Sequence, residues 1–286
     1  MKIERVGVVG CGLMGSGVAE VCARAGLDVV VHEVDDTMLA NGERRIRQSL
    51  DRAIRSGRLD ADDGERAMEA IRFSTDLSRM ADRQLVVEAV VELESEKVGV
   101  FAALDKVVED DDAILASNTS SIPVMKLAMA TRRPEHVLGI HFFNPVPVMN
   151  LVELVTSLLT GPEAASEAEA FATDVLRKRV IRSQDRAGFI VNALLIPYLL
   201  SSIRMLESGF ATAEDIDAGM VEGCRHPMGP LALTDLIGLD TTMAVADSLY
   251  AEFKEPLYAA PPLLSRMVEA GLLGRKAGRG FYTYNR

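Results

Sequence analysis

The sequence is poor in cysteine, in aromatic residues and in positive charge. It has no tryptophan, 5% aromatic residues and only three cysteines, Cys11, Cys22 and Cys224. Their spacing fits neither a metal site nor a disulfide framework, so we expect no bound metal and a reducing, cytoplasmic setting. The net charge of −11 argues against binding to nucleic acid or to anionic membranes, because both require basic surfaces.

Long uninterrupted hydrophobic runs are also missing. The longest apolar run, residues 188–206, contains Asn192, Pro197 and Arg204, so it predicts a buried helix rather than a membrane span. The N-terminal run VGVVGCGLMG is rich in glycine and is not typical of a signal peptide. What is present is a globular composition, with 48% hydrophobic and 26% charged residues.

Strand-like and helix-like segments alternate in the N-terminal part of the chain. Buried strands are expected at 4–9, 27–34, 83–92 and 113–120, and helices at 10–26, 36–71 and 95–108. This alternation predicts an α/β fold with a doubly wound, Rossmann-type parallel sheet.

The pattern becomes helical beyond residue 187. Helices are expected at 188–207, 213–222, 230–253 and 262–271, and only the final FYTY resembles a strand. We therefore expect two domains, an α/β domain over residues 1–186 and an all-helical domain over residues 187–286.

Residues 10–15 read GCGLMG, a G-x-G-x-x-G pattern between an expected strand and an expected helix. In that setting the first glycine allows a tight turn, the second lets the backbone approach a pyrophosphate, and the third lets the helix pack on the strand. The loop residues expected to contact a dinucleotide are Gly10, Gly12, Leu13, Met14 and Gly15.

Glu33 lies 18 residues after Gly15, where dinucleotide sites place the acid that binds the ribose hydroxyls. A carboxylate there repels a 2′-phosphate, so NAD is the expected cofactor and NADP is disfavoured. Arg44 and Arg45 are expected to lie too far along the chain to reverse this preference. The alternative, a structural glycine turn with Glu33 merely at the surface, is disfavoured by the strand and helix around the loop.

The stretch LGIHFFNPVPVMNLVELV, residues 138–155, places a histidine and a carboxylate among apolar residues. We expect two short strands joined by the NPVP turn, which would bring His141 and Glu153 together. A histidine takes and returns a proton near physiological pH, and a carboxylate beside it would fix its tautomer. These two residues alone leave catalysis and a purely structural pair evenly matched.

Two further polar features favour catalysis. SNTSS, residues 117–121, follows an expected strand, so its hydroxyl and amide groups stand at that strand's carboxyl end. Asn192 lies at the start of the long apolar helix and needs a partner there. A hydroxyl and an amide together can bind a substrate oxygen and stabilise charge that develops on it.

Taken in order, several motifs resemble those of the short-chain L-3-hydroxyacyl-CoA dehydrogenases, especially the bacterial 3-hydroxybutyryl-CoA dehydrogenases. The resemblance covers nearly the whole chain, and the stretch HFFNPVPVMNLVE is its most specific part. The motifs are GCGLMGSG, VVEAVVE, SNTSS, HFFNPVPVMNLVELV, DRAGFIVN, HPMGPLALTDLIGLDT and GRKAGRGFY.

The resemblance implies an NAD-dependent oxidoreductase of fatty acid metabolism that reversibly converts an (S)-3-hydroxyacyl-CoA to a 3-ketoacyl-CoA. It implies that His141 is the general base, that Glu153 orients it, and that Ser120 and Asn192 bind the reacting oxygen. It extends the cofactor contacts to Glu92, Lys97 and Asn144. It also implies an NAD-binding first domain and a helical second domain that binds substrate and forms a homodimer.

A CoA substrate is polyanionic, so an acidic chain needs a local basic segment. Residues 44–58, RRIRQSLDRAIRSGR, contain six arginines and one acid. Ile46, Leu50 and Ile54 mark an apolar stripe, and the arginines fall on the other face. Arg52 and Arg55 are the expected CoA contacts, although an ordinary solvated helix face is a common alternative.

Two other functions stay open on the sequence. A dehydrogenase of a small sugar acid such as L-gulonate would share the serine, histidine and asparagine, but it would not need residues 44–58. A non-catalytic NAD-binding structural protein would not need Ser120, His141, Glu153 and Asn192 together. The sequence does not set the acyl chain length.

Overall fold

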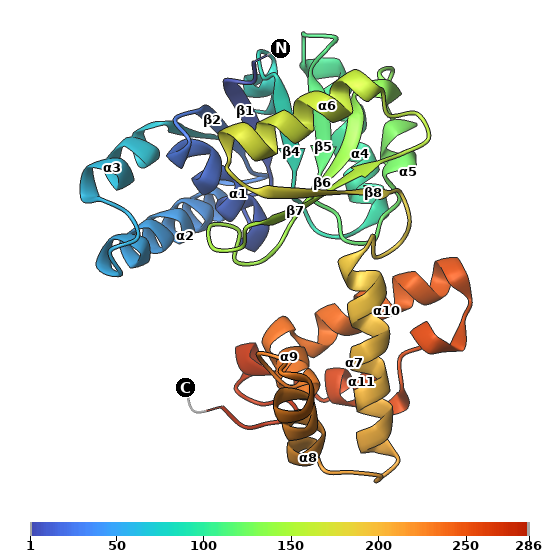
Figure 1. Ribbon diagram of the computed structural model, residues 1–286. Helices are drawn as coiled ribbons and strands as arrows, with labels where there is room; N and C mark the ends of the chain where they lie inside the picture. Colours follow the sequence, from blue (N-terminus) through green and yellow to red (C-terminus); the bar gives the residue numbers. More distant parts are fainter. Residues whose placement is uncertain (1, 285–286) are drawn as a thin grey trace. The chain divides into compact units, whose positions relative to one another are not determined.

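An eight-stranded sheet organises the N-terminal part of the chain, with strand order β3-β2-β1-β4-β5-β6-β7-β8 (Figure 1). The computed structural model describes residues 2–284. The strands are β1 Arg5–Val9, β2 Asp28–His32, β3 Ile71–Ser74, β4 Leu85–Glu88, β5 Ile114–Ser117, β6 Val137–Phe142, β7 Leu151–Thr156 and β8 Arg179–Gln184. All neighbouring pairs are parallel except β6 and β7, which are antiparallel. The predicted Rossmann-type sheet is therefore confirmed, with one antiparallel step.

The central strands form because their sequences are short, continuous apolar runs. Every residue of β4, β5 and β6 is buried, as expected for strands that are covered on both faces. The edge strand β8 differs, because Arg179, Arg182 and Gln184 are exposed and the residues between them are only half-buried. The sequence pattern predicts no strand there, and the structure adds one.

Helices connect the strands on both faces of the sheet (Figure 1). They are α1 Leu13–Arg24, α2 Asp36–Arg55, α3 Ala61–Glu69, α4 Glu94–Val107, α5 Val124–Ala128 and α6 Pro162–Ala170. The single helical region expected at 36–71 is two helices, because the chain turns after α2 and Gly57 adopts a φ of +68°. Along α2, Ile46 and Leu50 are buried, so the predicted apolar stripe faces the core.

The chain divides into two compact units, Met1–Asp185 and Arg186–Arg286. The second unit contains α7 Val191–Glu207, α8 Ala213–Ala218, α9 Pro230–Ile237, α10 Leu239–Phe253 and α11 Pro262–Glu269. The helix expected at 230–253 is wrong in one respect, because Gly238 with a φ of +104° separates α9 from α10. The FYTY stretch forms no strand among the described residues and contributes only an isolated bridge between Arg279 and Thr283.

Two buried carboxylates hold the C-terminal tail in the second unit. Asp235 accepts hydrogen bonds from the backbone N–H groups of Phe281 and Tyr282, both at 2.9 Å. Asp217 accepts from the N–H groups of Leu231 at 2.8 Å and Ala232 at 2.9 Å. Because each carboxylate satisfies two amides, the tail and the start of α9 are joined to the helical core.

Within residues 2–284, no helix is long and apolar enough to cross a membrane. The apolar helix α7 contains Asn192, Pro197 and Arg204, and its inner face packs in the core of the second unit. The helix is therefore partly buried rather than wholly buried as predicted, because Leu194 on its outer face is 73% exposed.

Candidate active site

The glycine loop between β1 and α1 has the geometry of a phosphate-binding turn. Gly10 adopts a φ of +90°, and a Cβ there would lie 2.7 Å from the carbonyl oxygen of Ala89. A Cβ on Gly15 would overlap the carbonyl oxygen of Gly10. A Cβ on Gly12 would meet no atom within 4 Å, so the loop is open on that side. Side chains are thus excluded where the loop is tight, and space is left where a ligand would approach.

Helix α1 begins at this loop without a side-chain cap. Its N-cap residue is Gly12, which supplies no side-chain cap, and the first turn of the helix contains no acidic residue. Leu13 is 64% exposed beside it. An uncapped helix N-terminus offers backbone N–H groups and a positive dipole end to an anion. The residues present therefore fit the pyrophosphate of a dinucleotide.

Glu33 lies just after β2 and reaches the same loop. Its Oε1 accepts a hydrogen bond from the N–H of Cys11 at 2.6 Å, and its Oε2 accepts from the N–H of Val34 at 3.1 Å. The carboxylate is half-buried and stands beside the glycine loop. This is the position in which an acid meets the ribose hydroxyls of a dinucleotide.

Arg45 also reaches the loop, and it lies nearer to it than its place in the sequence suggests. Its Nη1 donates to the carbonyl oxygen of Cys11 at 3.4 Å. The reason is the close packing of α2, because a Cβ on Gly42 would overlap the side chain of Cys11. A glycine in the middle of α2 thus brings the helix and its arginine against the loop.

His141 and Glu153 face each other across the antiparallel pair of β6 and β7, where they are register partners. The His141 Nδ1 and the Glu153 Oε2 are 2.7 Å apart. His141 is 7% exposed and Glu153 is fully buried. The ring of Phe143 lies 4.7 Å from the imidazole, centroid to centroid. The prediction that two strands bring these side chains together is confirmed.

The SNTSS segment follows β5 and is held by a carboxylate. The N–H of Ser120 donates to the Glu92 Oε1 at 2.9 Å, and the hydroxyl of Thr119 donates to the same oxygen. Asn118, which sequence reasoning did not single out, accepts from the N–H of Phe142 at 2.9 Å. Its amide therefore joins the end of β5 to the residue after His141.

Glu92 and Lys97 belong to a chain of charges behind that segment. The Lys97 Nζ lies 2.6 Å from the Glu88 Oε1 and 3.2 Å from the Glu92 Oε2. Burial raises the pKa of Glu92, but the charge of Lys97 and the hydrogen bonds from Thr119 and Ser120 outweigh it, so the pKa is lowered overall. Glu88 was missed from the sequence, although it stands in the same VVEAVVE motif as Glu92.

Asn144 lies in the exposed loop between β6 and β7 and precedes Pro145 through a cis peptide bond. A buried lysine holds this loop. The Nζ of Lys178 donates to the carbonyl oxygens of Val146 at 2.8 Å and Met149 at 2.7 Å. Burial lowers the pKa of Lys178. The sequence contains no pattern that would have identified this lysine.

Asn192, Arg52 and Arg55 are also predicted site residues, but they lie on helices and not at the ends of the sheet's strands. Asn192 lies in the first turn of α7, in the second unit, and is half-buried. Arg52 and Arg55 are exposed on α2. Arg47, on the same helix, is paired with Glu43 at 2.7 Å.

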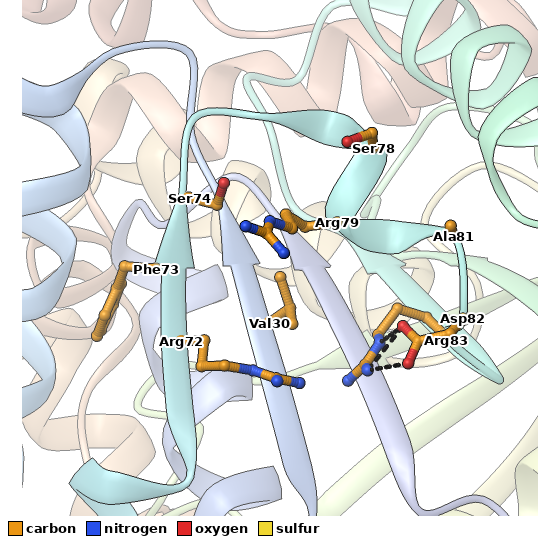
Figure 2. Close-up of a pocket in the computed structure, with 9 residues that line it drawn as sticks. All are labelled: Val30, Arg72, Phe73, Ser74, Ser78, Arg79, Ala81, Asp82 and Arg83. Carbon is orange, nitrogen blue, oxygen red and sulfur yellow. Dashed lines mark hydrogen bonds and ion pairs between the residues drawn. The ribbon is translucent and has the colours of Figure 1, made fainter.

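A separate cavity of about 600 Å³ lies over β2 and β3, away from these groups (Figure 2). Figure 2 shows the guanidinium groups of Arg72 and Arg83 pointing toward one another across its lower part. Asp28 pairs with both of them, at 2.7 Å and 3.1 Å, and Asp82 pairs with Arg83 at 2.7 Å. The cavity is lined by none of the predicted site residues, and its paired charges are already balanced.

Comparison with known proteins identifies the family. The family model for "3-hydroxyacyl-CoA dehydrogenase, NAD binding domain" matches residues 5–186, and that for the C-terminal domain matches residues 188–284. A 3-hydroxybutyryl-CoA dehydrogenase of Mycobacterium tuberculosis is 60% identical over 99% of both chains. A probable 3-hydroxybutyryl-CoA dehydrogenase of Deinococcus radiodurans is 44% identical over 98% of this chain and 100% of the relative.

Solved structures agree with these relatives. The crystal structure of M. tuberculosis FadB2 has a TM-score of 0.99 and 59% identity, with both chains fully covered. That of (S)-3-hydroxybutyryl-CoA dehydrogenase PaaH1 from Ralstonia eutropha has a TM-score of 0.94 and 43% identity, again over both full chains. The chain therefore belongs to the 3-hydroxyacyl-CoA dehydrogenase family of NAD-dependent oxidoreductases, which act on CH–OH groups.

Proposed function

We propose that the protein oxidises (S)-3-hydroxybutyryl-CoA to acetoacetyl-CoA, reversibly, with NAD as cofactor. The observation that carries this proposal is the buried His141–Glu153 pair, 2.7 Å apart. A pair of this kind serves proton transfer to or from a hydroxyl group. The printed names of the relatives in M. tuberculosis and D. radiodurans support the four-carbon acyl group.

The two side chains have complementary parts in this reaction. A carboxylate only accepts hydrogen bonds, so the Nδ1 of His141 carries the proton that faces Glu153. The Nε2 is then the atom that takes the proton from the 3-hydroxyl group. The negative charge of Glu153 stabilises the imidazolium that results, and in the reverse direction this imidazolium protonates the 3-oxygen. The bound nicotinamide supplies the hydride chemistry.

Other residues bind and orient the reactants. Ser120 and Asn192 bind the 3-oxygen, and Ser120 is supported by its backbone hydrogen bond to Glu92. Glu33 binds the adenine ribose, which favours NAD over NADP. The further cofactor contacts in this proposal are Gly10, Gly12, Leu13, Met14, Gly15, Glu92, Lys97 and Asn144.

Arg52 and Arg55 bind the phosphate groups of CoA. Both lie exposed on α2 in a chain whose net charge is −11. An isolated basic segment on an acidic surface attracts a polyanion locally, while the rest of the surface repels it.

The two units have different functions. Residues 1–186 bind NAD, and residues 187–286 bind substrate and form a homodimer in the cytoplasm. The family assignment of each part supports the first statement. The dimer is supported by large apolar side chains that the second unit leaves exposed, such as Leu194 on α7 at 73% and Phe210 in the turn after α7 at 80%.

The alternatives from the sequence are less well supported. The 60% identical relative is named as a 3-hydroxybutyryl-CoA dehydrogenase, and a sugar acid would leave the basic face of α2 without a ligand. A non-catalytic NAD-binding structural protein would use the glycine loop, but it would have no use for Ser120, His141, Glu153 and Asn192 together.

The experiment that tests the proposal follows NADH absorbance with acetoacetyl-CoA and, separately, with dehydro-L-gulonate. We expect NADH to be oxidised with acetoacetyl-CoA and not with the sugar acid. The reverse result would overturn the proposed substrate, and turnover of neither would overturn both enzyme assignments. NADPH in place of NADH should support slower turnover.

A further inference from the structure

Glu88 is a buried carboxylate whose contacts reach towards the site but which has no role in the reaction described so far. It is the last residue of β4, and none of its surface is exposed. Its Oε1 accepts from the Nζ of Lys97 at 2.6 Å and from the N–H of Val90 at 2.7 Å. Its Oε2 accepts from the hydroxyl of Ser117 at 2.6 Å. The charge is therefore fully compensated by donors from three neighbouring segments.

Lys97 connects Glu88 to Glu92. It lies in the first turn of α4 and is only 1% exposed. Its ammonium group lies between two carboxylates, 2.6 Å from Glu88 and 3.2 Å from Glu92. Because an ammonium group on a buried side chain must stay close to its counter-charges, the position of Lys97 depends on Glu88.

Glu92 completes the connection. One of its oxygens faces Lys97, and the other accepts from the N–H of Ser120 at 2.9 Å. The hydroxyl groups of Thr119 and Ser121 contact that same oxygen. A continuous chain of charge-assisted contacts thus leads from Glu88, through Lys97 and Glu92, to the backbone of Ser120.

We propose that Glu88 is a positioning residue for the dehydrogenase. Its buried charge fixes Lys97, Lys97 fixes Glu92, and Glu92 holds the segment that carries Ser120. Glu88 touches neither substrate nor cofactor in this arrangement. It acts through Lys97 and, by its hydrogen bond to the Ser117 hydroxyl, on the start of the segment that carries Ser120. The inference rests on the proposed function for the roles of Glu92, Lys97 and Ser120, but the contacts themselves do not depend on it.

The loss of this charge has a specific consequence. With glutamine at position 88, Lys97 keeps one counter-charge, Glu92, whose side chain is 37% exposed. The ammonium group then moves towards Glu92 and towards water, because a buried charge with a weak partner is costly. The Glu92 oxygen that holds Ser120 is displaced with it. Cofactor binding and the placement of Ser120 should both suffer.

The test compares Glu88→Gln, Lys97→Met and the double variant with the full-length wild-type chain. NADH affinity is measured by fluorescence titration, kcat and KM by turnover of acetoacetyl-CoA, and Tm by thermal unfolding. We expect each single variant to weaken NADH binding roughly tenfold and the double variant to be no weaker than Lys97→Met alone. Such non-additivity is the signature of residues that act through one another. Independent, multiplicative effects would overturn the proposal.

Asp105→Asn is the matched control, because it removes a buried carboxylate from the last turn of the same helix, α4. Asp105 pairs with Arg132 at 2.8 Å and Arg133 at 3.2 Å, and it contacts none of the proposed site residues. We expect this variant to lower Tm and leave the NADH affinity unchanged. If Glu88→Gln behaves in the same way, Glu88 is purely structural and the proposal fails.

If Glu88→Gln does not fold, Ser117→Ala is a milder variant that tests the same contacts. It removes one hydrogen bond to Glu88 and keeps the charge, so we expect the NADH affinity to weaken by about twofold to tenfold, the fold-change that corresponds to the net contribution of one hydrogen bond. An unchanged affinity would overturn the proposal. NADH binding requires no acyl substrate, so this readout remains decisive even if acetoacetyl-CoA is not turned over, which would count against the proposed function instead.

Discussion

Two buried carboxylates in each unit can be compared, because their side-chain partners differ. In the first unit, Glu153 contacts the imidazole of His141, and Glu88 contacts the ammonium group of Lys97. In the second unit, Asp235 accepts from two backbone N–H groups of the tail and from the hydroxyl of Tyr284. Asp217 likewise accepts from two backbone N–H groups at the start of α9 and from a tyrosine hydroxyl.

The two kinds of partner predict two different effects when the carboxylate is removed. A carboxylate that accepts from backbone amides satisfies groups that would otherwise be buried without partners, so its loss should weaken folding. A carboxylate that accepts from an imidazole or an ammonium group controls the proton or the position of that group. Its loss should appear in kinetics before it appears in the free energy of unfolding.

The strongest test of the comparison is His141→Gln. We expect kcat to fall by about 10²–10⁴-fold, the usual worth of a general base. NADH affinity and Tm should stay near those of the wild type, because glutamine can still donate to Glu153. Steady-state kinetics measure kcat, and fluorescence titration measures the NADH affinity. A variant with near-normal kcat would remove His141 from the role of the base.

Asp235→Ala tests the other side of the comparison. Three donors would lose their acceptor in the core of the second unit, so we expect a loss of about 3 kcal/mol or more in the free energy of unfolding. Urea denaturation measures this loss. At temperatures where the variant is folded, kcat should match the wild type. A large fall in kcat without a loss of stability would contradict the separation between the units.

Lys178→Met should fall between these two classes, because Lys178 is structural in its contacts but holds a loop of the site. The carbonyl oxygens of Val146 and Met149 lose their donor, and we expect a loss of about 2 kcal/mol. Asn144 lies in the same loop, so the KM for NADH should rise as well. An effect on stability alone would show that the loop keeps its shape without the lysine.

Arg52→Ala combined with Arg55→Ala should have a smaller effect that is confined to the substrate. We expect the KM for acetoacetyl-CoA to rise about threefold to tenfold, more at low salt than at high salt, because exposed charges are screened. Arg47→Ala is the control, since Arg47 lies on the same helix and is paired with Glu43. An equal rise in the control would mean that only the net charge of the helix matters.

The smallest effect concerns acid stability and Glu92. Its folded-state pKa lies below the ordinary value of 4.5, so the stability that it contributes is fully present above that value and is lost as the pH falls through the lowered one. Glu92→Gln should therefore lose less stability than the wild type as the pH falls below 4.5. Urea denaturation as a function of pH checks this, and parallel curves for the two proteins would contradict it.

Part of this structure follows from local sequence patterns. The glycine loop was predictable because its turn and its helix start need particular residues at particular positions. The contact between His141 and Glu153 was predictable because two apolar strands flank a proline-containing turn. In each case the information lies within about twenty residues of the chain.

Other features depend on packing between distant segments. The exposed strand β8 has a polar sequence and forms because β7 offers a free edge. Arg45 reaches the glycine loop only because Gly42 lets α2 approach Cys11. Glu88 is fully buried because it is the last residue of β4, whereas Glu92 lies beyond the end of that strand and is partly exposed. None of these is encoded in a periodicity of the sequence.

The pairing of β7 on both of its edges has a consequence for protein engineering. Side chains alternate between the two faces of a strand, so a shift of one residue in β7 would turn Glu153 away from His141. Since β6 and β8 both hold β7, residues can be inserted into the loop at 143–150 without this shift. A graft of the His141–Glu153 pair onto another scaffold should therefore preserve the parity of both strands, so that the two side chains still face each other.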